Sequence, residues 1–353
     1  MSSRVKWIDA TRGIAVLLVV LLHADIFAYR EFVEGNPRAL WEAVNTAAWP
    51  FLLAPLFMLA GLLRPTLLQQ PAFSPAIRRA AGTSLWTYSV WFVVFAFAAT
   101  AGLSTGVPPV EQPLQLLARF VLPGSVLWFL LALAFWTTLL PLVSRLPMSV
   151  LLSALTVLAV AHPWMPGKEG SDLYIRVLAY GLFFALGVYF SRQIRESVES
   201  GRVELLVVAA AIFAFASMKT TTDPMRDILA ALSFPLQFSA AAIILMYVAR
   251  FLVNRLPRVG SALAWYGERT LPIYTTHALL FFALKATPWW GQLVAGSLLM
   301  RWATPVLLVV AASLIGIAVH EVSQRVPPLR FLFALPQRRR RDAPRAVSRT
   351  REP

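Results

Sequence analysis

Residues 12–29 read RGIAVLLVVLLHADIFAY, an apolar run that is long enough to cross a lipid bilayer. Similar runs recur along the 353-residue chain, in which 58% of residues are hydrophobic and only 14% are charged. A soluble domain typically carries about 25% charged residues, and the mean hydropathy here is +0.66. The composition therefore predicts an all-α polytopic membrane protein with about ten transmembrane helices. The expected segments are 12–29, 47–63, 83–102, 125–143, 149–162, 173–191, 203–219, 228–250, 271–287 and 302–321.

The basic residues predict how these helices are oriented. If alternate loops are assigned to opposite sides, 22 Lys and Arg residues fall on the side of the N-terminus and nine on the other side. Cytoplasmic loops of membrane proteins carry the excess of Lys and Arg. The sequence therefore predicts an even number of crossings, with the N-terminus and the C-terminus both in the cytoplasm of a multi-pass cell-membrane protein.

The formal net charge of +15 has an explanation other than nucleic-acid binding. Much of it lies in short loops and in residues 336–353, which contain four consecutive arginines, 338–341. No basic face is interleaved with exposed aromatic residues on a soluble module, so no nucleic-acid partner is expected. We expect residues 1–335 to form the membrane-embedded domain. Residues 336–353 are expected to form a disordered, basic cytoplasmic tail that attracts anionic lipid headgroups.

Ionisable side chains in the first helix mark a candidate functional site, because such groups are costly inside a membrane. Arg12 and His23 are eleven residues apart, which is about three helical turns, so they project from one face about 16 Å apart along the axis. Asp9 lies three residues before Arg12 and can pair with it. Asp25 lies about 200° around the helix from His23 and is not expected to orient that imidazole.

This geometry suits a reaction between a long anionic cofactor and a hydroxyl group. An arginine near the cytoplasmic mouth can bind phosphates, and a neutral imidazole deeper in the membrane can take a proton from an attacking alcohol. A structural interpretation is also open: Arg12 anchors the helix at the headgroups, and His23 is a core histidine with its hydrogen bonds satisfied.

Two later segments carry further candidate residues. His277 lies three residues after Tyr274, near the start of the ninth expected helix, so the two side chains share a face. The alternative interpretation of this pair is a polar packing contact at a helix start. Trp128 stands in an aromatic stretch that is more often a lipid-facing anchor or core segment than a ligand site.

Four segments together resemble one family. Residues 4–15, RVKWIDATRGIA, followed by His23, resemble the opening motif of acyltransferase family 3 membrane proteins, in which ten residues separate an arginine from a histidine. Residues 55–61, PLFMLAG, are similar to the second-helix motif of the family, and residues 127–130, LWFL, to its fourth-helix tryptophan motif. Residues 270–277, TLPIYTTH, are similar to the late motif of the fucose 4-O-acetylase-like branch.

The resemblance implies an integral membrane O-acyltransferase of ten helices. Such an enzyme takes acetyl from cytoplasmic acetyl-CoA and modifies a hydroxyl of a carbohydrate, glycolipid or glycoside, as in polysaccharide modification at the cell envelope. Carried over by position, His23 would be the catalytic base or acyl relay, Arg12 would help to bind the coenzyme, and Asp9 would support Arg12. Arg78 and Arg79 would bind the coenzyme phosphates, and the substrate would be bound by Trp128, Tyr274 and His277. No metal is expected.

Two other functions remain open from the residues alone. A transporter or flippase of a sugar or lipid-linked precursor would use Arg12 and His23 as substrate or proton-relay groups, although internal repeats, which many transporters have, are not evident. A non-catalytic membrane partner in an envelope assembly would tolerate substitution of both residues.

Overall fold

Each of the ten apolar segments overlaps a helix in the computed structural model, which describes residues 5–122, 125–161, 172–217 and 225–336. No strand occurs in these ranges, and the predicted basic tail lies outside them from residue 337 onward. The helices are α1 (Lys6–Ala28), α2 (Asn36–Ala48), α3 (Leu53–Leu62), α4 (Pro75–Thr100), α5 (Pro113–Val121), α6 (Trp128–Val143), α7 (Met148–Ala161), α8 (Asp172–Tyr189), α9 (Ser191–Ser200), α10 (Val203–Ser217), α11 (Met225–Arg255), α12 (Pro257–Gly267), α13 (Thr270–Lys285), α14 (Trp290–Gly296) and α15 (Leu298–Arg325). Short 3₁₀ turns add η1 (Trp49–Phe51), η2 (Leu67–Gln69) and η4 (Pro327–Leu332).

Five helical segments of the described chain are long and apolar enough to cross a membrane, or six if α8 and α9 count as one span bent by 69°. The five are Lys6–Ala28, Asn36–Leu62, Pro75–Thr100, Leu232–Arg255 and Leu298–Arg325. Helices α6, α7 and α10 are apolar but have only 14 to 16 residues, or about 21–24 Å at 1.5 Å per residue, less than the ~30 Å hydrocarbon core. The all-helical membrane architecture is confirmed, and the count of ten stays a prediction.

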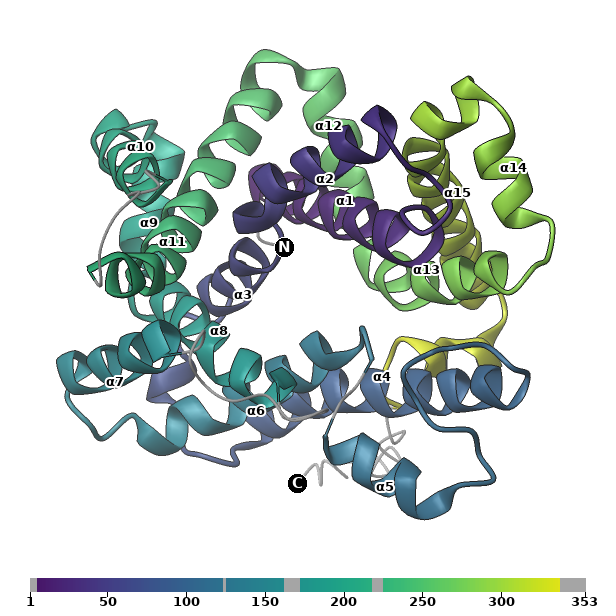
Figure 1. Cartoon of the computed structure of the whole chain (residues 1–353). Helices are drawn as coiled ribbons and strands as arrows, with labels where there is room; N and C mark the ends of the chain where they lie inside the picture. The colour runs from purple at the N-terminus through teal and green to yellow at the C-terminus, as the bar shows by residue number, and fades with distance from the viewer. Residues whose placement is uncertain (1–4, 123–124, 162–171, 218–224, 337–353) are drawn as a thin grey trace, which may run out of the picture.

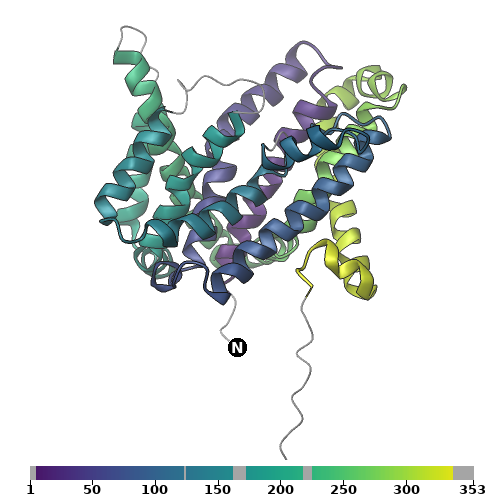
Figure 2. The same cartoon turned by 90° about the horizontal axis from the view of Figure 1, so that it is seen from below.

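The first helix occupies an interior position. It contacts α2, α3, α11, α12, α13 and α15, and Figure 1 shows α1 and α3 inside the outline formed by the other helices. The start of α1, the start of α4 and the end of α15 lie toward one side of the bundle (Figure 2). Which side faces the cytoplasm stays a prediction.

Glycines bring the backbones of α1 and α12 into direct contact. A Cβ atom on Gly13 would lie 2.4 Å from the carbonyl oxygen of Leu263, and one on Gly267 would lie 1.8 Å from that of Asp9. Small residues of this kind let membrane helices approach closely. The contact fixes the first turns of α1, which carry Asp9 and Arg12, against the end of α12.

A reciprocal pair of glycines joins α3 to α8. A Cβ atom on Gly61 would lie 2.2 Å from the carbonyl oxygen of Phe184, and one on Gly187 would lie 2.0 Å from that of Met58. The neighbouring helix α6 is held against α8 by the Trp136 indole, which donates a hydrogen bond of 2.6 Å to the Val177 carbonyl oxygen. These contacts hold the early turns of α8 against α6 and its later turns against α3.

Candidate active site

The two intramembrane histidines contact each other directly, although 254 residues separate them in the sequence. The Nδ1 atom of His23 on α1 lies 2.8 Å from Nε2 of His277 on α13, and the two rings are nearly parallel, with an interplanar angle of 8°. His277 is fully buried, while His23 is half-buried. The family resemblance assigned both residues to one site, and the structure shows a hydrogen bond between them.

The backbone determines the direction of this hydrogen bond. Nδ1 of His277 lies 3.1 Å from the carbonyl oxygen of Ile273, four residues earlier on α13. A carbonyl oxygen only accepts, so this Nδ1 carries the proton, and Nε2 of a neutral His277 is an acceptor. His23 therefore donates from Nδ1, and its Nε2 keeps the lone pair. A nitrogen in this state can accept a proton from a group that approaches His23 from its other edge.

A cavity of about 160 Å³ lies beside His23. It is smaller than the ~300–1,000 Å³ pockets that hold drug-sized ligands, so it accommodates one small group at the end of a substrate. Aromatic side chains make up much of its wall. The lining includes Trp49 of η1, Trp128 of α6, Tyr180 of α8, Phe234 of α11 and Tyr274 of α13.

Two of the predicted substrate-binding residues, Trp128 and Tyr274, line this cavity, and both are almost fully buried. The Tyr274 hydroxyl donates a hydrogen bond to the carbonyl oxygen of Val126, just before α6 begins at Trp128. Tyr274 therefore contributes its ring to the wall and holds the start of α6. Trp128 packs edge-on against Tyr180, with ring centroids 5.6 Å apart.

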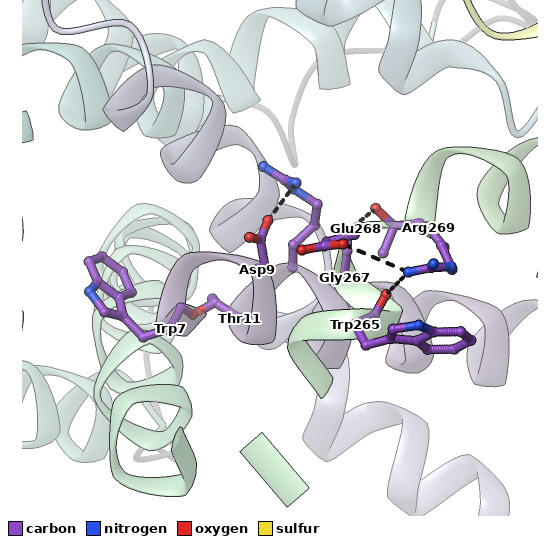
Figure 3. A network of polar contacts seen from close by, with 9 residues as sticks. Trp7, Asp9, Thr11, Trp265, Gly267, Glu268 and Arg269 are labelled. Carbon is purple, nitrogen blue, oxygen red and sulfur yellow. Dashed lines mark hydrogen bonds and ion pairs between the residues drawn. The ribbon is translucent and has the colours of Figure 1, made fainter. Parts of the chain in front are cut away.

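Arg12 and Asp9 form the predicted pair at the other end of α1. Nη1 of Arg12 lies 3.1 Å from an oxygen of Asp9, and the Arg12 side chain is 28% exposed whereas that of Asp9 is 5% exposed. Figure 3 shows Asp9 beside the end of α12, where Gly267 adjoins it. Arg269 also lies here and packs its guanidinium 4.1 Å from the centre of the Trp265 ring.

The other predicted coenzyme ligands, Arg78 and Arg79, are exposed on the first turns of α4. This end of α4 lies on the same side of the bundle as the start of α1 (Figure 2). Arg64, which follows α3, lies closer to the centre; it donates to the Ala60 carbonyl oxygen and is half-buried.

Sequence reasoning missed the partners of Asp25 and the position of Arg176. Asp25, fully buried, pairs with Arg30 and accepts a 3.0 Å hydrogen bond from Asn45, in agreement with the expectation that it does not orient His23. Arg176 of α8 lines the cavity together with His23, and no local motif marked it. Among the residues that the structure describes, no group of three or more His, Asp or Glu side chains could hold a metal ion.

The family model of the acyltransferase domain of acyltransferase family 3 matches residues 5–321. This range covers nearly the whole chain, including α13 and α1 with its three candidate residues Asp9, Arg12 and His23. No match was found among curated proteins or solved structures. The family match decides for an enzyme over the transporter and the non-catalytic partner, and the chain therefore belongs to acyltransferase family 3 and is a membrane acyltransferase.

Proposed function

We propose that the protein moves an acetyl group from acetyl-CoA to a hydroxyl group of a carbohydrate, glycolipid or glycoside, with His23 as the general base. The observation that carries this proposal is the His23–His277 hydrogen bond beside a cavity. In that arrangement Nε2 of His23 is free to accept a proton, and His277 holds the ring in the required tautomer.

In the chemical step, His23 accepts one proton from the acceptor hydroxyl and later donates it to the leaving thiolate. Nε2 of His23 removes the proton from the acceptor hydroxyl as the oxygen forms a bond to the thioester carbonyl carbon. The carbon–sulfur bond then breaks, and the leaving thiolate of coenzyme A takes the proton from the imidazolium. His277 stabilises that imidazolium, because the Nδ1–H of His23 points at its Nε2.

An acyl relay is the second possible role of the same nitrogen. In a relay, Nε2 itself attacks the thioester, and the acetylated imidazole then passes its acetyl group to the acceptor. The relay allows donor and acceptor to occupy the site in turn. Rapid mixing with acetyl-CoA in the absence of acceptor distinguishes the two, because a relay releases one equivalent of coenzyme A per enzyme in a burst.

The two substrates would approach His23 from opposite ends of α1. Arg12, about 16 Å along the axis from His23, would bind coenzyme phosphates with Asp9 holding its guanidinium. Arg78 and Arg79, on the same side of the bundle, would add positive charge. The acceptor would enter the cavity near the other end, where Trp128 and Tyr274 present aromatic rings. With the start of α1 in the cytoplasm, the donor comes from inside the cell.

Labelled acetyl transfer tests the proposal. Membranes that contain the protein, and matched membranes that lack it, receive acetyl-CoA labelled in the acetyl group. We expect protein-dependent label in a lipid, polymer or small-glycoside fraction, and release by mild alkali would identify an O-ester. Protein-dependent transfer from palmitoyl-CoA but not from acetyl-CoA would overturn the acetyl assignment, and label that alkali does not release would overturn the hydroxyl acceptor.

Arg12→Gln is expected to weaken the donor site. Loss of a charge-assisted contact to a phosphate costs about 1.5–3 kcal/mol, so the KM for acetyl-CoA should rise about 10- to 100-fold with a smaller change in kcat. Arg192→Gln is the matched control, because that side chain is 84% exposed and pairs only locally with Glu196. Steady-state kinetics against donor concentration measure both variants. An unchanged KM in Arg12→Gln would contradict the assigned role.

A further inference from the structure

The cavity beside His23 contains one permanently charged side chain among its lining residues, Arg176. This residue lies on the second turn of α8, is exposed, and therefore stands at the rim, while His23 is half-buried. Among the described side chains, no carboxylate pairs with Arg176. Guanidinium groups keep their charge at all physiological pH values and present a planar set of donors.

The cavity opens on the side of the bundle away from Arg12. Its lining residues come from the second half of α1, from η1, from the starts of α3, α6 and α8 or the residues just before them, and from Phe234 of α11 and Tyr274 of α13. The first turns of α1, where Arg12 pairs with Asp9, contribute none of its wall. The basic residue at this rim is therefore separate from the arginines expected to bind the coenzyme, so a different anion would have to meet it.

We propose that Arg176 binds an anionic group of the acceptor, a carboxylate or a phosphate, while a hydroxyl of the same molecule reaches Nε2 of His23. This inference rests on the proposed function and adds the substrate class to it: the acceptor is an acidic sugar. Arginine matches both anions with two parallel hydrogen bonds. The cavity admits only the part of the sugar that carries the reacting hydroxyl, and the rings of Trp49, Trp128 and Tyr180 give that part apolar faces to pack against.

The position of Arg176 argues against a purely interfacial role. An arginine at a helix end in a membrane protein often extends toward the lipid headgroups, and such a residue faces lipid. Arg176 instead borders the same cavity as His23, and Tyr180, one helical turn further along α8, continues that wall. A guanidinium at the entrance to an aromatic cavity selects what enters by charge, in addition to any contact with lipid.

Two pairs of probes test the proposal: methyl glucuronide against methyl glucoside, and methyl galacturonide against methyl galactoside, with glucose 1-phosphate as the phosphate arm. Binding is measured with the purified full chain as ligand-induced thermal stabilisation at constant ionic strength, which does not depend on catalysis. We expect the anionic member of at least one pair, or the phosphate, to bind about tenfold more tightly than its neutral counterpart.

Variants assign the charge preference to one residue. Arg176→Gln should abolish the preference by weakening the anionic probes about tenfold or more while leaving the neutral ones unchanged, and Arg176→Lys should retain part of it. Arg38→Gln is the matched control, because Arg38 is a part-exposed arginine of α2 that pairs with Glu42. Equal binding of charged and neutral probes by the wild type, or an equal loss of both in Arg176→Gln, would overturn the inference.

Labelled transfer to the same probes separates this inference from the proposed function. If label moves to neutral and anionic glycosides at equal rates, the transferase proposal stands and the charge selection is wrong. If anionic probes stabilise the protein through Arg176 but no label moves from any acyl-CoA, the charge selection stands and the acyl-CoA reaction is wrong.

Discussion

Replacing His23 by alanine is expected to lower the rate of acetyl transfer about 10²- to 10⁴-fold, the range that a positioned general base contributes. The acceptor hydroxyl then has no base among the described lining residues, which otherwise offer aromatic rings, aliphatic side chains and the cationic Arg176, and Nε2 of His277 lies one hydrogen-bond length beyond the lost ring. The KM for acetyl-CoA should change little, since Arg12 lies at the opposite end of α1. Initial rates of transfer, measured at equal protein level, give both values.

Two controls make the His23 result specific. His320→Ala removes a half-buried histidine near the end of α15, outside the cavity lining, and should leave the rate within about twofold of the wild type. Added imidazole should restore part of the activity of His23→Ala, because truncation enlarges the cavity at the position of the lost ring. A His23→Ala enzyme that transfers acetyl at the wild-type rate would contradict the assignment of His23 as base or relay.

The sequence predicted the positions of the helices better than it predicted their lengths. Long apolar runs mark helices in a membrane protein because a helix satisfies its own backbone hydrogen bonds inside the bilayer, and each of the ten runs overlaps one. It did not predict α12, whose exposed and buried residues mix apolar and polar types. The sequence also did not predict the contact of Gly13 with α12, because a glycine in a helix indicates close packing only when the partner helix is known.

The sequence predicted candidate residues for the site, but it did not predict how they contact one another. Helical periodicity placed Arg12 and His23 on one face because that relation depends on only eleven residues of one helix. The His23–His277 bond depends on how α1 and α13 pack, and no local pattern encodes it. Arg176 escaped detection because an arginine near a helix end is common in membrane proteins, and its role follows only from sharing a cavity with His23.

The role of His277 as a positioning residue leads to the second large effect. His277→Phe keeps an aromatic ring of similar size in the core but removes the acceptor for the Nδ1–H of His23. His23 then loses both its fixed tautomer and the stabilisation of its imidazolium, which a hydrogen bond to a charged group supplies at about 1.5–3 kcal/mol. We expect kcat to fall about 10- to 100-fold, with the KM values for donor and acceptor nearly unchanged.

A structural role alone would give a different pattern, and two further variants reveal it. His277→Gln keeps an amide oxygen that can accept from Nδ1 of His23, so it should recover much of the kcat lost in His277→Phe even though its packing is poorer. Thr276→Val changes the adjacent buried residue, whose hydroxyl bonds only to the Pro272 carbonyl oxygen of its own helix, and should leave kcat near the wild-type value. If His277→Phe preserved kcat while His277→Gln abolished it, ring packing rather than hydrogen bonding would explain the contribution of His277 to kcat. We expect kcat to be higher in His277→Gln than in His277→Phe, because the hydrogen-bond acceptor atom, and not the ring, orients His23.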